Sequence, residues 1–234
     1  MATKRTNDLP FTFLNIAMTA DGKIAPANRQ FIPIGSKRDY QLLLELRATA
    51  DAVMSGARTV NAFPINMGPG GKKYRDLRRK SGLSENNLRI IVSGSGSIDP
   101  DAEIFKHRFS PIIILTTERA SKSKLNCLKN LGAEIKVCGE ETLEFTEALR
   151  WLRKEWEVKR LLSEGGGEVN DALFRAHLVN EVYLTLCPFV FGGRNAPTLA
   201  DGLGVQKLAD ATRLKMKGMQ RVGDELYLRY EVER

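Results

Sequence analysis

A run of three glycines, Gly165–Gly167, is the feature of this sequence best suited to hold a ligand. It follows a short segment, Arg160–Ser163, that reads as a strand, and it precedes a predicted helix that extends through Leu173 and Leu178. Backbone N–H groups at the start of a helix, together with the helix dipole, bind phosphate. The spacing matches neither the dinucleotide fingerprint nor a P-loop. We therefore expect a phosphate-binding turn, with a tight turn that holds no ligand as the alternative.

Small and hydroxyl-bearing residues also follow the other predicted strands. Ser55-Gly56, Ser93–Gly96 and Thr116-Thr117 each come directly after an apolar segment. In open α/β sheets, ligands bind beyond the carboxyl ends of the strands, and small residues let the backbone approach a ligand. Loops favour Gly and Ser for conformational reasons as well. The pattern therefore supports a ligand cleft without identifying the ligand.

The cysteines and histidines exclude several kinds of chemistry. The chain has three cysteines, Cys127, Cys138 and Cys187, and two histidines, His107 and His177. No Cys-x-x-Cys pair or zinc-ligand spacing is present, so we expect no metal site. A Ser-His-Asp or Cys-His hydrolase would depend on one of two unpromising histidines. An odd number of cysteines without a signal peptide indicates reduced thiols and a cytoplasmic protein.

The charge balance raises a second possibility. The chain carries 36 Lys and Arg against 28 Asp and Glu, a formal net charge of +8. Part of the excess lies in Lys72–Lys80, within a Gly- and Lys-rich stretch, residues 66–87, that we interpret as a solvated loop of functional or mobile type. Such a basic segment attracts phosphate or nucleic acid. No aromatic stacking pattern accompanies it, so we do not expect nucleic acid as a partner.

The periodicity along the chain predicts the elements that must position these residues. Ser36 and Asp39 resemble a capping box that opens a helix, Ser121 caps a second helix, and Gly132 ends it. An amphipathic helix begins near Thr142. The predicted strands are residues 11–18, 51–55, 88–92, 112–116, 134–138 and 160–163, followed by a C-terminal hairpin of residues 213–220 and 226–233.

This alternation of strands and helices favours an α/β fold with a mainly parallel central sheet flanked by helices and an antiparallel C-terminal hairpin. We find no repeat or linker and expect a single domain over residues 1–234, with a flexible N-terminus at 1–9. The longest clean apolar run, Ile112–Leu115, is far shorter than the roughly 20 residues of a membrane span, so no membrane association is expected.

A set of motifs in a fixed order gives a more specific indication. The sequence resembles the reductase domain of riboflavin biosynthesis, the RibD C-terminal type, which has a dihydrofolate-reductase-like fold. The resemblance covers roughly residues 10 to 232. Each motif alone is weak, and the ordered set is fairly specific. The motifs are Met18–Ile24, Gly56–Val60, Ser163–Gly167, Leu178–Glu181 and Pro188–Gly193.

The resemblance implies NADPH-dependent reduction of a phosphoribosylamino-pyrimidine, with hydride added to C1′ of the sugar. It places Lys23 near the reacting sugar, where it would polarise the sugar oxygen or assist proton transfer. Arg58 is our own addition, as a cation able to meet the 2′-phosphate. The other residues expected at the cofactor are Ala17, Phe31, Thr59, Ser93, Gly166, Gly167, Glu168 and Val169.

On the substrate side, the resemblance implies that Glu164 accepts hydrogen bonds from the pyrimidine and that Arg47 meets the 5-phosphate. Arg29 stands where relatives often carry a serine near the substrate. Each of these residues also has an alternative role without a ligand. Lys23 would be an ordinary turn lysine, Glu164 a carboxylate favoured by the dipole at a helix start, and Arg47 a solvated cation on a helix face. The resemblance also implies a homodimer.

Two departures concern the substrate more than the cofactor. Relatives typically carry an Asp-Asp-Pro type sequence where this chain has Asn61-Ala62-Phe63-Pro64, and Phe31 replaces a common tryptophan. Three alternatives therefore stay open. The chain could reduce another pteridine- or pyrimidine-like compound, bind a nucleotide without chemistry, or bind nucleic acid through the basic segment.

Overall fold

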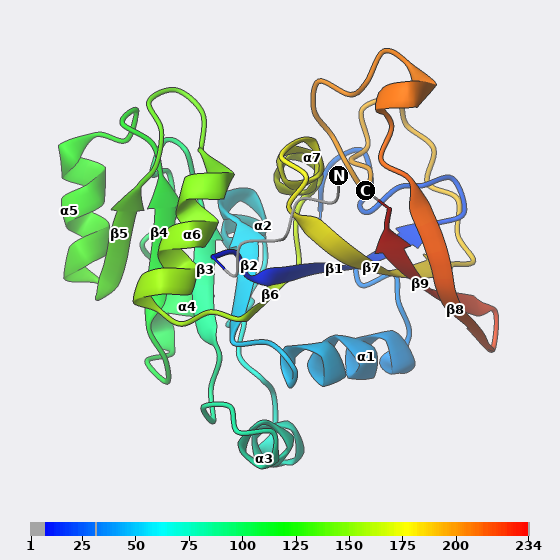
Figure 1. The fold of residues 1–234 in the computed structure, drawn as a ribbon, viewed down its shortest axis with the longest axis horizontal. Coiled ribbons are helices and arrows are strands. Elements are labelled where there is room, and N and C mark those ends of the chain that lie inside the picture. Colours follow the sequence, from blue (N-terminus) through cyan, green and yellow to red (C-terminus); the bar gives the residue numbers. More distant parts are fainter. Residues whose placement is uncertain (1–7, 31, 234) are drawn as a thin grey trace.

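The computed structural model describes residues 8–30 and 32–233, and these form an α/β structure built on one nine-stranded sheet (Figure 1). The strand order is β5-β4-β3-β2-β6-β1-β7-β9-β8. In this order, all neighbouring strands between β5 at one edge and β7 pair in parallel. The last two pairs are antiparallel: β7 with β9, and β9 with β8. The predicted fold class, a mainly parallel sheet with an antiparallel C-terminal hairpin, is confirmed.

The bounds of the elements are as follows. The strands are β1 (Phe11–Thr19), β2 (Ala52–Gly56), β3 (Leu88–Val92), β4 (Ile112–Thr116), β5 (Ala133–Val137), β6 (Arg160–Ser163), β7 (Val179–Cys187), β8 (Leu214–Val222) and β9 (Glu225–Val232). The helices are α1 (Lys37–Arg47), α2 (Ala57–Ala62), α3 (Lys72–Lys80), α4 (Glu103–Lys106), α5 (Lys122–Asn130), α6 (Phe145–Glu155) and α7 (Gly167–Arg175), with a 3-10 turn at Leu208–Asp210.

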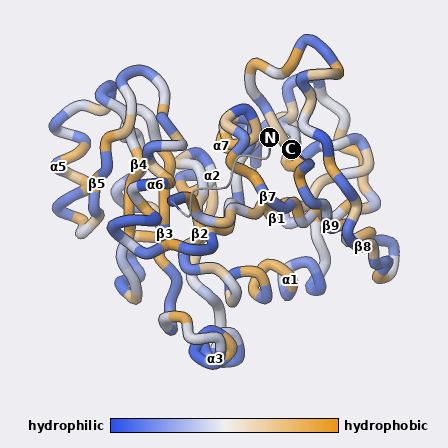
Figure 2. The backbone as a smooth tube through the Cα atoms, viewed as in Figure 1, coloured by the Kyte–Doolittle hydropathy of each residue, from blue (hydrophilic) through white to orange (hydrophobic). Residues whose placement is uncertain are grey.

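Helices cover both faces of the parallel part of the sheet. One core cluster joins α6 and α7 to one face, and the other joins α1, α2, α4 and α5 to the opposite face. The central strands are therefore largely apolar on both sides, which explains the hydrophobic run of β4 and that of β3 after the buried Arg89 (Figure 2). This layering places the loops that follow β1, β2, β3 and β6 together at one end of the sheet.

The helix caps follow the sequence signals in part. The hydroxyl of Ser36 accepts a hydrogen bond from Arg38 N and caps α1, as predicted. The capping box itself is a wrong prediction, because the backbone N–H of Ser36 donates to Glu225 rather than to Asp39. The caps of α5 are confirmed: Ser121 accepts from Lys124 N, and Gly132 has a left-handed φ of 87° just after the helix.

The prediction that residues 66–87 form a solvated loop is wrong. Lys72–Lys80 form the helix α3, which packs against α1 through Tyr74 and buries Arg78 almost completely. The helix was missed because its hydrophobic side consists of one aromatic ring and the stem of an arginine. Its charge is partly balanced within the helix, because Asp76 pairs with both Lys72 and Arg79.

Other boundaries also differ from the expectation. The helix after the glycine run ends at Arg175, and Leu178 precedes β7 instead of belonging to the helix. The short helices α2 and α4 have no signal in the periodicity. Residues 1–7 of the predicted flexible N-terminus lie outside the described residues. No helix of the part of the chain described here is long and apolar enough to cross a membrane.

Candidate functional site

A cleft of about 870 Å³ opens at the carboxyl ends of the central strands. It is bounded by α1 on one side and by the starts of α2 and α7 on the other. All the predicted site residues except Lys23 and Phe31 line it. They are Ala17, Arg29, Arg47, Arg58, Thr59, Ser93, Glu164, Gly166, Gly167, Glu168 and Val169. Phe31 lies outside the described residues.

The glycine run forms the tight connection between β6 and α7. Gly165 and Gly166 have φ angles of 59° and 90°, a region that residues with a Cβ rarely adopt. Gly167 begins the helix, and a Cβ there would lie 2.5 Å from Asp201 Oδ2. The space beside Gly166 is open, since a Cβ there would meet only Thr59 Oγ1, at 3.8 Å. The first N–H groups of α7 have no partner within the helix, so this end of the cleft suits an anionic group.

The helix α2 lies beside this turn and brings a cation to it. Gly56 N donates to Gly165 O at 3.0 Å, which joins the end of β2 to the glycine run. Arg58, in the first turn of α2, forms an ion pair of 2.5 Å with Glu168 in the first turn of α7. Both side chains are largely exposed, so Glu168 holds Arg58 at the mouth of the cleft by a contact that solvent weakens.

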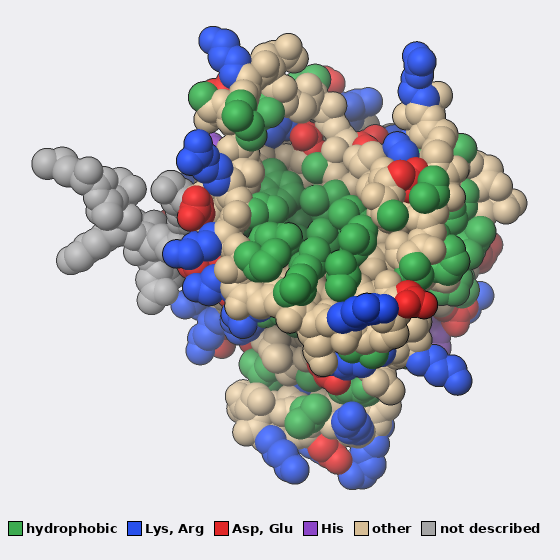
Figure 3. Space-filling view, turned by 90° about the vertical axis from the view of Figure 1, so that its right-hand side faces the viewer, with side chains coloured by type: hydrophobic (Ala, Val, Ile, Leu, Met, Phe, Trp, Pro, Cys, Tyr) green, Lys and Arg blue, Asp and Glu red, His purple; other side chains and the backbone are tan. Residues whose placement is uncertain are grey.

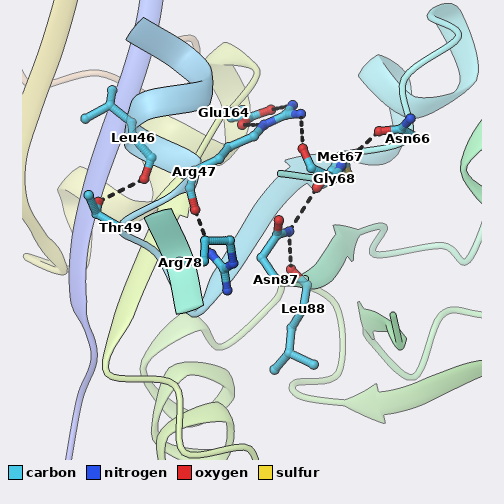
Figure 4. Close-up of polar contacts among 10 residues, drawn as sticks. All are labelled: Leu46, Arg47, Thr49, Asn66, Met67, Gly68, Arg78, Asn87, Leu88 and Glu164. Carbon is cyan, nitrogen blue, oxygen red and sulfur yellow. Dashed lines mark hydrogen bonds and ion pairs between the residues drawn. The ribbon is translucent and has the colours of Figure 1, made fainter. Parts of the chain in front are cut away.

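On the opposite wall, Arg47 and Glu164 form a buried ion pair (Figure 4). Arg47 Nε and Nη2 each donate to one carboxylate oxygen of Glu164 at 2.6 Å, and Nη1 donates to Gly68 O at 2.7 Å. Burial lowers the pKa of Arg47, but Glu164 outweighs it and raises the pKa above its usual value. The pair therefore presents a fixed carboxylate and a fixed guanidinium to the cleft.

A second arginine holds this pair in place from behind. Arg78 Nη1 donates to the carbonyl oxygen of Arg47 at 2.7 Å (Figure 4). It also donates to Ala50 O at 2.5 Å, and Arg78 Nε donates to Ser84 O. The carbonyls at the end of a helix lack intrahelical partners, and a cation there also suits the helix dipole. The buried guanidinium of Arg78 thus fixes the end of α1 from which Arg47 reaches the cleft.

Sequence reasoning missed several polar residues that line the cleft, among them Asn15, Asp39 and Asp201. Asn15 lies inside an apolar strand, and the only available signal was a polar residue in a buried run. Its Oδ1 is buried and has no hydrogen-bond partner among the described residues. Asp39 was interpreted as a helix-capping residue. Asp201 accepts hydrogen bonds from Thr198 and stands beside the glycine turn.

Lys23 does not line the cleft, although its neighbours Ile24 and Ala25 do. Its ammonium group donates to Ala196 O at 3.3 Å, and its backbone forms an isolated bridge with Thr198. The turn before it is held by Asp21, which accepts hydrogen bonds from Thr19 and from Gly192 N.

The segment that departs from the family pattern lies at the edge of the cleft. Asn61 accepts a hydrogen bond from Asp99 N at 2.9 Å and so joins α2 to the loop after β3. Asn61, Ala62, Phe63 and Pro64 all line the cleft. The acidic side chains that do line it are Asp39, Glu164, Glu168 and Asp201.

A second cavity of about 570 Å³ lies next to the cleft, between α1 and the start of α3. Tyr40, Arg47 and Asn66 line both. Arg75 also faces this cavity, where it pairs with Glu85 and donates to Gly70 O.

Comparison with known proteins places the chain among reductase domains. Residues 10–228 match the RibD C-terminal domain. A 2,5-diamino-6-ribosylamino-4(3H)-pyrimidinone 5′-phosphate reductase of Aquifex aeolicus is 30% identical over 227 residues, which cover 95% of this chain and 96% of that protein. A reductase of the same name from Methanothermobacter thermautotrophicus is 31% identical, with 96% of this chain and 99% of that protein covered.

Solved structures agree on the fold. A pyrimidine reductase-like protein of Corynebacterium diphtheriae superposes with a TM-score of 0.79 at 23% identity, over 100% of this chain and 96% of that chain. RibD of Acinetobacter baumannii also gives a TM-score of 0.79, at 19% identity. There the match covers 97% of this chain and 58% of the longer protein.

Proposed function

Because the chain belongs to the RibD C-terminal domain family, we propose that it is the pyrimidine reductase of riboflavin biosynthesis and uses NADPH. The proposed substrate is a ribosylamino-pyrimidine 5′-phosphate, whose ribosyl group becomes a ribityl group. The observation that carries this proposal is one cleft in which the glycine turn at the start of α7 faces a fixed Arg47–Glu164 pair across the ends of the strands.

The turn at the start of α7 fits the pyrophosphate of a nicotinamide dinucleotide. Open space beside Gly166 and the unpartnered N–H groups of α7 provide an anion site of the right kind. Ala17, Thr59 and Ser93 line the cleft on either side of this turn and would hold the rest of the cofactor. When bound, the reduced nicotinamide supplies the hydride.

Selectivity for NADPH over NADH would rest on Arg58. Its guanidinium lies at the mouth of the cleft, where it could contact a 2′-phosphate bidentately. Glu168 occupies this guanidinium in the structure, so the phosphate would have to displace an exposed carboxylate.

The substrate would lie against the opposite wall. Glu164 would accept hydrogen bonds from the pyrimidine, while Arg47 and Arg29 would meet the 5-phosphate. Arg47 donates to both carboxylate oxygens of Glu164 and balances its charge. The carboxylate is therefore already oriented before the substrate binds, and no conformational entropy is lost in orienting it. Lys23 would turn from Ala196 O toward the sugar to polarise its oxygen.

We also propose that the protein is a homodimer. Leu214, Met216 and Met219 of the edge strand β8 are 39%, 51% and 66% exposed. They pair with Val232, Tyr230 and Leu228 of β9, which pack against the core, whereas the β8 side chains themselves stay exposed. Hydrophobic side chains gather over this side of the molecule (Figure 3). A second copy would cover this face and remove the open sheet edge.

The unpaired thiols of the protein also support a cytoplasmic location.

Two measurements test the proposed function. NADPH and NADH are titrated into the protein, and reduction of 2,5-diamino-6-ribosylamino-4(3H)-pyrimidinone 5′-phosphate is followed by NADPH oxidation. We expect selective NADPH binding and turnover. Gly166→Val should abolish cofactor binding, whereas Gly132→Val, at a similar left-handed φ of 87° but outside the cleft, should not. Absence of binding by either coenzyme would overturn the proposal.

A further inference from the structure

The start of α1 brings a carboxyl group into the cleft that the proposed site does not use. Asp39 lines the cleft, and its side chain lies directly against Gly35, where any Cβ would collide with Asp39 Oδ2. Asp39 Oδ1 is buried and has no hydrogen-bond partner among the described residues. A carboxyl oxygen in that situation is costly if it carries a charge.

Glu225, at the start of β9, stands next to Asp39 and is hydrogen-bonded quite differently. It accepts hydrogen bonds from Ser36 N and Ser36 Oγ, both at 2.7 Å, and from the hydroxyl of Tyr227. Burial raises the pKa of Glu225, but these hydrogen bonds outweigh it and bring the pKa below its usual value. The hydrogen bonds therefore favour the carboxylate form of Glu225, whereas Asp39 Oδ1 has no such support.

The groups that face Asp39 from the elements around it are neutral or negative. Thr185 and Cys187 face it from β7, and Glu225 and Tyr227 face it from β9. The neighbouring Arg38 is paired with Glu45. Burial first and the charge of Glu225 next raise the pKa of Asp39, while the hydroxyl of Thr185 lowers it in part. Among the described residues, no cation forms an ion pair with Asp39.

Two carboxyl groups with such different surroundings divide into an acid and a base. The Thr185 hydroxyl is also buried and lacks a full hydrogen bond, so the contact with Asp39 leaves both groups incompletely satisfied. Thr185 lies directly across from Ala17, a residue of the proposed cofactor site. The contact with Thr185 therefore places Asp39 near Ala17 on the wall of the cleft.

The proposed reaction needs a proton as well as a hydride. Opening of the sugar ring breaks the C1′–O4′ bond, and the electron pair stays on O4′, which takes a proton to become a hydroxyl group. The nitrogen lone pair forms a C1′=N double bond. Hydride addition at C1′, with the reduced nicotinamide as the reductant, returns that pair to nitrogen. The balance is one hydride and one proton per turnover, so the protein needs an acid.

We propose that Asp39, whose unpartnered carboxyl group lines the cleft, is the acid that protonates the ring oxygen O4′, and that the adjacent Glu225 is its positioning residue. This inference rests on the proposed reductase function. After proton transfer, the Asp39 carboxylate lies beside the charged Glu225. It therefore regains a proton from solvent through the open cleft.

The test is the pH dependence of kcat, measured from pH 4 to 10 at saturating NADPH and pyrimidine substrate. An acid must be protonated to act, so kcat of the wild-type protein should fall as pH rises through the pKa of Asp39. Asp39→Asn should lower kcat by about 10²- to 10⁴-fold and remove this alkaline limb, with NADPH affinity unchanged. Glu225→Gln removes the neighbouring charge, and the limb should move to lower pH.

Asp171→Asn is the matched control, because Asp171 is a buried carboxylate outside the cleft. The pH profile of kcat in this variant should match that of the wild type. If Asp39→Asn does not fold, the shift in Glu225→Gln decides the question. An alkaline limb that neither variant changes in an active enzyme overturns this inference and leaves the reductase function standing. A wild-type protein that binds NADPH but reduces no pyrimidine overturns both.

Discussion

Arg47 and Glu164 lie 117 positions apart in the chain and meet as a bidentate ion pair with both bonds at 2.6 Å. Their side chains are only 8% and 11% exposed. Arg47 comes from the end of α1 and Glu164 from the residue after β6, so the pair joins a helix to the sheet it covers. A pair of this kind both stabilises the fold and fixes the wall of the cleft.

Breaking this pair should destabilise the protein strongly. Arg47→Met leaves the Glu164 carboxylate buried without its partner, and we expect a loss of about 3–5 kcal/mol in the free energy of unfolding. Arg47→Met/Glu164→Gln should cost less than the two single changes together. Urea unfolding measures all three. Arg38→Met, which breaks the more exposed pair with Glu45, is the control and should cost less than about 1 kcal/mol. Additive losses would show that the pair is not coupled.

The helix α3 should depend on one arginine of its basic run. Arg78→Met removes the donor to the carbonyls of Arg47, Ala50 and Ser84, and we expect a loss of about 3 kcal/mol in unfolding free energy. Arg79→Met, one residue along and half exposed, should change stability by about 0.5 kcal/mol or less. Equal effects of the two changes would contradict the anchoring role of Arg78.

Coenzyme selectivity should depend on Arg58 and Glu168 in opposite directions. Arg58→Ala should raise the Kd for NADPH about tenfold, which corresponds to roughly 1.4 kcal/mol of binding free energy, and should leave the Kd for NADH unchanged. Glu168→Gln frees the Arg58 guanidinium and should strengthen NADPH binding. Fluorescence titration of both coenzymes measures these effects. Parallel changes for NADPH and NADH would place the 2′-phosphate elsewhere.

The exposed strand β8 should control association. Met219→Lys places a charge among the exposed apolar side chains of the edge strand, and we expect it to convert a dimer to a monomer in analytical ultracentrifugation. Leu77→Lys, at a 41% exposed position on α3, is the control and should leave the dimer intact. A wild-type protein that is monomeric at all accessible concentrations would overturn the proposed homodimer.

The sequence was sufficient for the parts of the fold that local patterns encode. Alternating strands and helices predicted the parallel sheet, and the turn at Gly223-Asp224 predicted the C-terminal hairpin. The glycine run between β6 and α7 lies where it was expected. The helix α3 was missed because its stability comes from Arg78 bonding to carbonyls of another helix, which no local pattern records.

For the candidate site, the sequence identified residues at strand ends but not their partners. Glu164 and Arg47 were each expected at the substrate, but nothing in the sequence indicated that they bond to each other. Asp39 looked like a helix cap because Ser-x-x-acid has that meaning locally. Its environment depends on Thr185 and Glu225, which lie 146 and 186 positions away in the numbering.

The sequence by itself determined the order of the elements, the glycine turn and the family, because backbone preferences and hydrophobic periodicity act over a few residues. The tertiary structure decided which charges meet, which carboxyl group is buried and which cation anchors a helix. Those properties depend on desolvation and on distances of a few ångströms between side chains from distant segments, and these are set only when the sheet assembles.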